Sequence, residues 1–503
     1  MTATETDREH LDVLIIGAGI SGIAAARNLA RRCPQKSYAI LESRGVSGGT
    51  WDLYRYPGVR SDSDVHTLGF GFKPWKGERS LADGDAILAY VREAAAESGV
   101  DRRIRYHHRV VGIEWSRDDG RWRVEVERTD SGETVGLTCG FVWCCSGYFA
   151  YDDGYLPDFE GTERFAGRIA HPHRWPEDLE YEGKRVVVIG SGATAVSLVP
   201  ALAESAEHVT MLQRSPSYLF PVPGVDPLAR ALRRFLPPKA AYSIVRWKDI
   251  LTGSFAFWFC RRYPDLAKRV IRKAAERSLP ADFDFDRHLS PSYNPWEQRP
   301  CALRDGDLYQ GISEGRVEIV TDTIETFTES GLRLTSGAEL EADVIVTATG
   351  FNLEFLGGMK PVVDGEAVDI ASVLTYKGMM ASGVPNLAFT VGYTNASWTL
   401  KVELTCDFVC RLLNHMDANG LAEVVPMADD PTIRAVPIID LSSGYVQRSL
   451  DKLPQQGSHE PWRLKQNYLL DSRMIRHGPI EDGALRFAPA TAAERRPAEA
   501  VAG

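Results

Sequence analysis

The chain has 503 residues, 44% of them apolar, and a formal net charge of −10. This length predicts two or three domains with separate cores, and the negative charge argues against a general nucleic-acid-binding protein. The eight cysteines include no C-x-x-C pair, and the first residues, MTATETDREH, contain neither the basic nor the apolar segment of a secretory signal. We therefore expect a cytoplasmic protein whose cysteines are reduced and buried.

The first predicted strand covers residues 11–16, whose continuous apolar run LDVLII is typical of a strand buried on both faces. It leads into GAGISG, residues 17–22, and then into a helix. In such a loop Gly17 forms the tight turn, Gly19 lets the backbone approach a pyrophosphate, and Gly22 lets the helix pack on the strand. The pattern predicts a dinucleotide-binding unit.

An acidic residue and a long loop follow this unit. The next predicted strand, residues 38–41, ends at Glu42, where a carboxylate would bind the ribose hydroxyls of an adenosine without a 2′-phosphate. The segment GGTWDLYRYPGVRSD, residues 48–62, is too rich in Gly, Pro and aromatic residues for a regular element. We expect an ordered loop that holds a flat, half-apolar ring such as a flavin. The alternative is a packed surface loop.

The string FAGRIAHPHRWP, residues 165–176, reads Phe-x-Gly-x3-His-x3-Trp-Pro and lies between the first glycine-rich loop and a second one. A motif between two dinucleotide sites indicates electron transfer between two cofactors. His171 and His173 alternate within it, but two histidines are too few ligands for a metal site, and we expect no metal.

The second glycine-rich loop is GSGATA, residues 190–195, between a predicted strand over residues 185–189 and a helix that continues to Leu202. The following strand, residues 208–212, ends in Gln213 and Arg214 instead of an acid. A carboxylate would repel a 2′-phosphate, whereas an arginine binds it through charge-assisted hydrogen bonds. The pattern predicts an NADPH site; the alternative is an arginine that is merely solvated.

Residues 222–290 form a predicted helical insertion with a basic composition. Between Leu228 and Leu279 there are 13 Lys and Arg residues but 3 Asp and Glu residues. The longest apolar run, residues 250–260, is too short to span a membrane. The basic charge fits a solvated or interdomain face; attraction of NADPH and weak contact with an anionic membrane surface are the alternatives.

The predicted fold class is α/β, with two Rossmann-like dinucleotide-binding domains and the helical insertion in the second. The apolar segment EADVIVTATG, residues 341–350, is expected to return to the first sheet. The FAD domain is then discontinuous, over residues 1–150 and 341–487, and the NADPH domain covers residues 151–221 and 291–340. The remaining residues, 488–503, are rich in Ala and Pro and are expected to be disordered.

These motifs resemble a known family, the type I Baeyer–Villiger monooxygenases. The resemblance is carried by the string at 165–176, by the two Rossmann motifs and by a longer pattern, G-G-x-W-x4-Y-P-G-x3-D, which residues 48–62 match. Stretches such as HPHRWPED, VIGSGATAV and SYNPWEQR resemble more narrowly the ethionamide-activating branch. The similarity extends over nearly the whole chain, from Leu11 to Phe487.

The resemblance implies FAD, NADPH and O2 as reactants and a small ketone or sulfur compound as substrate. The implied reaction inserts one oxygen atom beside a carbonyl, through a flavin C4a-peroxide, to give an ester or lactone. By motif position Arg299 is the catalytic arginine, which stabilises anionic charge, and Asp62 is the carboxylate that orients it. Gln298 stands where the family often has a lysine that helps to hold the 2′-phosphate, which weakens the expected NADPH preference.

Further roles come from the same resemblance. The linker residues that couple the domains to nicotinamide placement are Phe165, Gly167, His171 and Trp175. The residues expected at FAD are Gly17, Gly19, Ser21, Gly22, Glu42, Gly49, Thr50, Trp51, Asp52, Asp62 and the backbone of Val110. Those expected at NADP are Arg60, Gly190, Ser191, Gly192, Ala193, Thr194, Ala195, Gln213 and Arg214.

Three other functions fit the same cofactors. The first is mainly sulfur or nitrogen oxygenation, of thioethers or thioamides. The second is a disulfide or quinone reductase; the lack of a C-x-x-C pair argues against the disulfide reductase. The third is a non-catalytic flavoprotein that senses NADPH.

Overall fold

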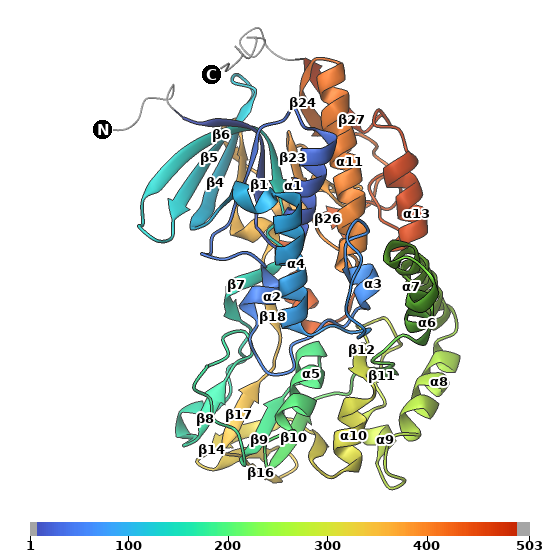
Figure 1. Cartoon of the computed structure of the whole chain (residues 1–503). Helices are drawn as coiled ribbons and strands as arrows, with labels where there is room; N and C mark the ends of the chain where they lie inside the picture. The colour runs from blue at the N-terminus through green and yellow to red at the C-terminus, as the bar shows by residue number, and fades with distance from the viewer. Residues whose placement is uncertain (1–7, 490–503) are drawn as a thin grey trace.

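A computed structural model describes residues 8–489. Figure 1 shows two sheets, one above the other, with the insertion helices along one side of the molecule. Both sheets carry helices on their faces, so the predicted α/β class is confirmed. Among the described residues, no helix is both long enough and apolar enough to cross a bilayer.

The first sheet is mixed, and its main path runs β20-β19-β4-β5-β6-β1-β2-β3. Parallel pairs join β1 to β2 and to β6, whereas β4, β5 and β6 form an antiparallel meander. β23 pairs parallel with β6, and thereby brings the C-terminal half of the chain back into this sheet. The strands are β1 (His10–Ile16), β2 (Tyr38–Leu41), β3 (Ile104–Arg105), β4 (His108–Ser116), β5 (Arg121–Arg128), β6 (Thr134–Cys144), β19 (Pro361–Val363), β20 (Glu366–Ala367), β21 (Thr375–Tyr376), β22 (Met380–Ala381) and β23 (Leu387–Phe389).

Helices cover one face of this sheet. α1 (Ile20–Arg32) packs against α4 (Gly84–Ser98) and α11 (Trp398–Ala418), and its Ala-rich side is fully buried. α1 begins at Ile20, within the GAGISG loop and two residues before Gly22, where we expected the helix to start. Short helices α2 (Thr50–Leu53) and α3 (Val65–Leu68) lie in the following loops, so the expectation that residues 48–62 contain no regular element was wrong by one helical turn.

The second sheet is parallel, with the order β13-β10-β9-β17-β8. β17 (Val344–Thr347) pairs with β9 (Arg185–Ile189) and with β8 (Arg168–Ala170). The prediction that residues 341–350 return to the first sheet was therefore wrong. The remaining elements here are β10 (His208–Gln213), β13 (Val317–Thr321), α5 (Ala193–Leu202), α10 (Asp307–Ser313) and the small antiparallel sheet of β14 (Ile324–Thr328), β15 (Gly331–Leu334) and β16 (Glu339–Glu341).

The two crossings between the domains lie together. β7 (Phe149–Gly154) leaves the first domain, β18 (Phe351–Leu353) returns to it, and the two pair antiparallel. The chain thus returns to the first domain after residue 350, ten residues later than the predicted boundary at 341, and re-enters the first sheet at β19.

The helical insertion is confirmed as α6 (Pro227–Phe235), α7 (Pro238–Arg262), α8 (Pro264–Glu276) and α9 (Phe285–His288), between the paired strands β11 (Leu219–Val222) and β12 (Cys301–Arg304). It packs on both domains. Tyr242 and Ile250 of α7 join the core of the first domain, whereas Ala275 and Phe285 join that of the second.

The C-terminal elements close the first domain. They are β24 (Leu421–Pro426), β25 (Val436–Pro437), α12 (Gly444–Gln447), β26 (Gln455–Gln456), α13 (Tyr468–Ser472) and β27 (Leu485–Pro489). Ala488 and Pro489, assigned to the tail from sequence, pair with β24 instead. Residues 490–503 of the predicted disordered tail lie outside the described residues.

Candidate functional site

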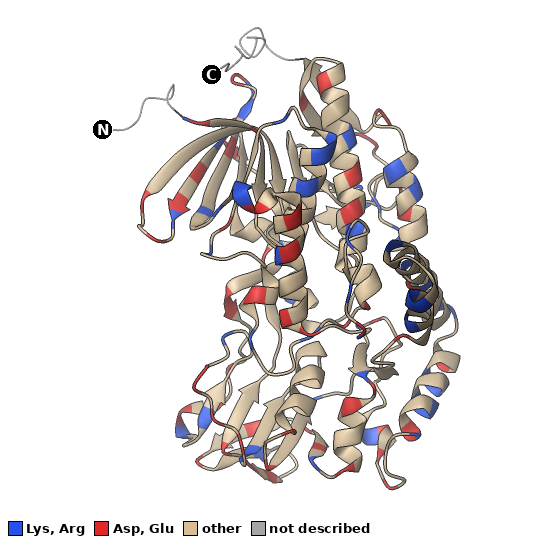
Figure 2. Ribbon diagram, in the orientation of Figure 1, with Lys and Arg blue, Asp and Glu red and all other residues tan. Residues whose placement is uncertain are grey.

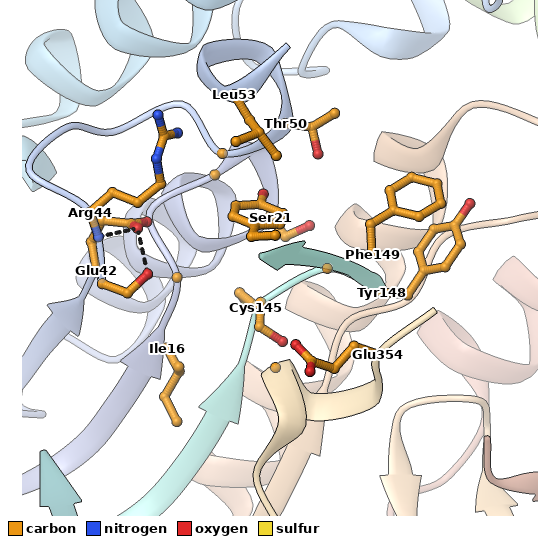
Figure 3. A pocket seen from close by; sticks show the side chains of 18 of the residues that line it. Ile16, Ser21, Glu42, Arg44, Thr50, Leu53, Cys145, Tyr148, Phe149 and Glu354 are labelled. Atoms are coloured by element: carbon orange, nitrogen blue, oxygen red, sulfur yellow. Dashed lines mark hydrogen bonds between the residues drawn. The ribbon is translucent and has the colours of Figure 1, made fainter. Parts of the chain in front are cut away.

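A cavity of about 490 Å³ opens at the carboxyl end of β1 and β2. This volume lies within the range of cofactor sites, and the edge of a parallel sheet is where α/β folds bind ligands. Figure 3 shows Glu42 and Arg44 on one side of the cavity and Tyr148 and Phe149 on the other. Eight residues predicted at FAD line it: Gly17, Gly19, Ser21, Glu42, Gly49, Thr50, Trp51 and Val110.

The glycine-rich loop forms one wall of the cavity. Two of its positions leave no room for a side chain. Gly17 has φ +100°, and a Cβ there would lie 2.7 Å from the carbonyl oxygen of Cys145. A Cβ on Gly22 would lie 1.8 Å from the carbonyl oxygen of Gly17. Gly22 therefore acts by close packing and does not line the cavity. The N-terminus of α1 faces the space where an anion would bind.

Glu42 is buried at the end of β2 and is held by two backbone donors. Its Oε2 accepts from the N–H of Ala18 at 2.8 Å, and its Oε1 accepts from the N–H of Arg44 at 3.0 Å. A carboxylate has about four acceptor positions, so these bonds fix its orientation and leave capacity for a ribose hydroxyl.

The loop over residues 48–62 is anchored by Asp52. This buried carboxylate receives three guanidinium groups, from Arg44 at 2.6 Å, Arg92 at 2.7 Å and Arg55 at 2.9 Å. Asp52 does not line the cavity, so the expected contact between its side chain and FAD is not supported. Its pairs with these arginines instead hold Thr50 and Trp51 at the cavity wall.

A second, smaller pocket adjoins the first. Tyr148 and Trp398 line both, and their rings stack at 5.1 Å between centroids and 13° between planes. The Trp398 indole N–H also donates to Ser21 Oγ at 2.8 Å, which ties α11 to the first turn of α1. The other lining residues are Arg299, Gly378, Val391, Gly392, Tyr393, Thr394, Ile438, Ile439, Leu441, Tyr445, Leu464 and Gln466.

Arg299 reaches this second pocket from the segment before β12. Its Nη2 donates to Asp62 Oδ1 at 2.9 Å, and the two side chains are 31% and 30% exposed. The negative charge of Asp62 outweighs the effect of burial and raises the pKa of Arg299 above its ordinary value. The structure thus brings together the two residues, 237 positions apart, that the resemblance predicted as a pair, and Arg299 remains a cation at any working pH.

The second glycine-rich loop leads from β9 into α5. Gly192 and Ala193 are exposed, so the N-terminal amides of α5 face solvent, where they can receive a phosphate. Ser191 Oγ donates to the carbonyl of Ser215 at 3.2 Å, just beyond the end of β10. Arg214, directly after β10, is exposed and lies beside this loop.

Two residues predicted at NADP have other partners. Gln213 is buried, and its Nε2 donates to the carbonyl of His288 at 2.7 Å and to Thr321 Oγ1 at 2.9 Å. Arg60 forms an ion pair with Asp307 of α10. Neither side chain points freely to a cofactor; Gln213 ties β10 to α9, and Arg60 ties the loop over 48–62 to the second domain.

Residues 165–176 belong to the linker between the domains and hold it in place by packing. A Cβ on Gly167 would lie 2.4 Å from the carbonyl oxygen of Asp343, so the linker lies close to the start of β17. His171 Nδ1 accepts from the N–H of His173 at 3.1 Å, and burial lowers the pKa of His171. Phe165 is buried and Trp175 packs against the core of the second domain.

Within the described chain, one group of side chains brings three potential metal ligands within 4.8 Å: Asp64, His66 and Asp249. Lys248 Nζ lies 2.6 Å from Asp249 Oδ1, and His66 Nδ1 lies 3.0 Å from Asp249 Oδ2. This network joins α3 to α7 and already contains a cation, the ammonium group of Lys248. His171 and His173 do not belong to it.

The chain is similar to known proteins over most of its length. A sequence model described as flavin-binding monooxygenase-like matches residues 80–391, and one for an NAD(P)-binding Rossmann-like domain matches residues 15–77. The FAD-containing monooxygenase EthA of Mycobacterium tuberculosis is 55% identical over 481 residues, which cover 95% of this chain and 98% of the relative. The probable FAD-binding monooxygenase AlmA of Acinetobacter baylyi is 43% identical over 481 residues, 95% of this chain and 96% of the relative.

Two solved structures share the fold. Steroid monooxygenase bound to NADP is 24% identical, with a TM-score of 0.73 over 96% of this chain and 100% of that chain. Cyclohexanone monooxygenase from Rhodococcus sp. Phi1 bound to NADP+ is 21% identical, with a TM-score of 0.73 and the same coverage of 96% and 100%. At these identities the similarity shows the fold alone.

Proposed function

The chain belongs to the flavin-binding monooxygenase-like family, and on this basis we propose that it inserts one oxygen atom of O2 beside a ketone carbonyl, with FAD and NADPH as cofactors. The product is an ester or lactone. The family and the cofactor pair, FAD and NADP, agree with the expectation from the sequence. The substrate and the type of oxygenation are our proposal.

The larger cavity has the features that a flavin dinucleotide needs. The backbones of Gly19 and Gly49 lie close together: a Cβ on Gly49 would be 3.1 Å from Gly19 Cα. Backbone amides rather than side chains therefore form this wall. Glu42 supplies a fixed carboxylate at the adenosine end, and Trp51, Tyr148 and Trp398 supply flat apolar surfaces. When bound, the reduced flavin supplies the electrons that activate O2.

Arg299 is the main observation in support of the proposal. It is a permanent cation in a pocket that shares Tyr148 and Trp398 with the larger cavity. With FAD held in that cavity, Arg299 would be placed to stabilise negative charge that develops on oxygen. A preorganised, partly buried cation stabilises such charge more strongly than it would in bulk solvent. Asp62 acts through Arg299, as a positioning residue that holds the guanidinium toward the pocket.

NADPH is proposed to bind at the second glycine-rich loop. The amides at the start of α5 would receive the pyrophosphate, and exposed Arg214 would pair with the 2′-phosphate. Because Gln213 is held by His288 and Thr321, Arg214 is the residue of this pair that can discriminate NADPH from NADH.

The test separates cofactor binding from oxygen insertion. Arg299→Ala should retain FAD and its anaerobic reduction by NADPH but lose ester formation by at least 100-fold, since removal of one preorganised donor typically costs that much. Arg299→Lys is the matched control, because it keeps the positive charge but lacks the planar guanidinium group. It should keep part of the activity. Ester formation by Arg299→Ala at the parental rate would remove Arg299 from the mechanism.

Sulfur oxygenation is a second activity of the same pocket. Apart from Arg299, the pocket is lined by neutral side chains, most of them apolar or aromatic, which suit a thioether or thioamide as well as a ketone. A sulfur lone pair attacks a protonated, electrophilic oxygen, so this reaction depends less on a stabilising cation. Assays of a ketone and a sulfide with both Arg299 variants should show a smaller loss for sulfoxide than for ester; equal losses would contradict this distinction.

A further inference from the structure

The helical insertion concentrates the exposed apolar side chains of the described chain. Of 17 large hydrophobic residues that are exposed, ten lie between Leu228 and Val270. Monomeric soluble proteins rarely leave such residues clustered unless the surface has a partner. The ten are Leu228, Phe235, Ile244, Trp247, Leu251, Phe255, Trp258, Tyr263, Leu266 and Val270.

On α7 these residues follow one stripe. Ile244, Trp247, Leu251, Phe255 and Trp258 are spaced by three or four residues, the spacing of one helix face, and are 47% to 61% exposed. A different set of α7 residues is buried, and two of them, Tyr242 and Ile250, join the core of the first domain. The helix therefore has two apolar faces, and only one of them is covered by residues 8–489, the part of the chain that the structure describes.

The stripe continues beyond α7. Tyr263, Leu266 and Val270 extend it along α8 with the same spacing, and Trp258 contacts Tyr263 edge to face at 5.9 Å. At the other end Trp247 contacts Tyr468 of α13 at 6.2 Å, next to exposed Leu469 and Leu470. We call the exposed faces of α7, α8 and α13 the insertion surface.

Basic side chains flank this apolar surface. Figure 2 shows Lys and Arg distributed along α7 and α8, and the exposed ones include Lys239, Arg261, Arg262, Arg269 and Lys273. The segment between Leu228 and Leu279 contains three acidic residues, Asp249, Asp265 and Glu276. Asp249 pairs with Lys248, and Glu276 pairs with Arg272. An excess of positive charge thus surrounds the aromatic stripe.

We propose that the insertion surface docks on anionic lipid bilayers. Amphipathic helices with Trp, Phe and Leu on the apolar face and Lys and Arg beside it lie in the headgroup region, where the rings are buried and the cations meet anionic lipids. A second copy of the chain is a poorer partner, because two like-charged surfaces would face each other. A nucleic acid would match the charge but would not bury Leu251, Phe255 or Leu266.

The location of the surface gives it a function that rests on the proposed oxygenation. Phe257 of α7 contacts Trp296, three residues before Arg299, at 5.4 Å. On the other side, Tyr468 follows Leu464 and Gln466, which line the second pocket. Docking would therefore place this pocket beside the bilayer, from which a lipid-soluble ketone or sulfur compound could enter.

The test measures binding of the FAD-loaded protein to vesicles, without turnover. Flotation with phosphatidylglycerol–phosphatidylcholine vesicles should recover the protein, and pure phosphatidylcholine vesicles or about 0.5 M NaCl should recover much less. Phe255→Ser/Trp258→Ser should weaken partitioning at least tenfold, because two aromatic side chains no longer enter the bilayer. Arg261→Glu/Arg262→Glu should weaken it at least tenfold on anionic vesicles alone.

Leu156→Ser/Ile169→Ser is the matched control, since both residues are exposed but lie outside the insertion surface. It should partition within twofold of the parent. No recovery with anionic vesicles, or equal effects of the control and the aromatic variant, would overturn the proposal. A concentration-dependent dimer that Phe255→Ser/Trp258→Ser abolishes would overturn it in favour of a second copy. Because no arm uses catalysis, failure here leaves the proposed oxygenation untouched.

Discussion

Asp62→Asn tests how much of the function depends on the ion pair between Asp62 and Arg299. The substitution keeps the size of the side chain and removes its charge. A hydrogen bond between charged groups contributes about 1.5–3 kcal/mol and one with a neutral partner about 0.5–1.5 kcal/mol. Both side chains are about one-third exposed, so a loss of about 1–2 kcal/mol is expected, which corresponds to a roughly 5- to 30-fold lower rate of ketone oxygenation.

Steady-state product formation and NADPH consumption give the readout. The variant should bind FAD as the parent does and should consume more NADPH for each product molecule, because a mobile Arg299 protects the activated oxygen less well. Asp178→Asn is the matched control: Asp178 also pairs with an arginine, Arg168, but at 3.2 Å on an exposed surface. If Asp62→Asn lowers the rate equally in the parent and in Arg299→Ala, the two residues are not coupled and the reasoning is refuted.

Three further predictions follow from the fold. Gly22→Ala should lower the flavin content at least tenfold, measured as flavin absorbance per protein, because its Cβ would overlap the carbonyl of Gly17. Gly253→Ala in α7 is the control and should retain FAD, because nothing lies within 4 Å of a Cβ there. Arg214→Ala should raise the KM for NADPH at least tenfold and leave that for NADH unchanged; equal changes would contradict a 2′-phosphate contact. Burial lowers the pKa of Lys401 to about 7, so in the folded state it loses its proton well below the pH at which it does so in the unfolded chain. Its contribution to stability should therefore rise between pH 7 and 9, by up to about 1.4 kcal/mol per pH unit, and Lys401→Met should abolish that rise in thermal unfolding.

The nucleotide-binding units could be predicted from sequence because strands buried on both faces read as continuous apolar runs, and glycine spacing marks the loops that follow. The observed β1, β2, β9 and β10 agree with the predicted strands within one residue at each end. β17 shows the limit. Its apolar run correctly indicated a buried strand, but burial does not specify a partner, and the strand pairs with β9 in the second sheet.

The candidate site was only partly predictable. Arg299 and Asp62 were linked through motif positions, since nothing local relates residues 237 positions apart. The directions of Asp52 and Gln213 could not be predicted, because each is set by distant partners, three arginines for Asp52 and His288 with Thr321 for Gln213.

Aromatic residues of the second pocket were missed for a related reason. Tyr148, Tyr445 and the pair Tyr393 and Trp398 come from three separate segments, and each taken alone reads as an ordinary core residue. The stretch VGYTNASWTLK, residues 391–401, contains Tyr393 and Trp398, but its sequence gives no indication that they face a pocket. Their common role depends on tertiary packing.

Oxygen insertion beside a carbonyl, with Arg299 at the reacting centre, is the central claim. The most direct measurement is mass analysis of products formed from a panel of ketones under ¹⁸O₂ with NADPH. We expect the parent to form an ester or lactone that carries one ¹⁸O at the bridging oxygen, and Arg299→Ala to form none above background. Unlabelled product, or NADPH oxidation that continues at the same rate without O2, would contradict it.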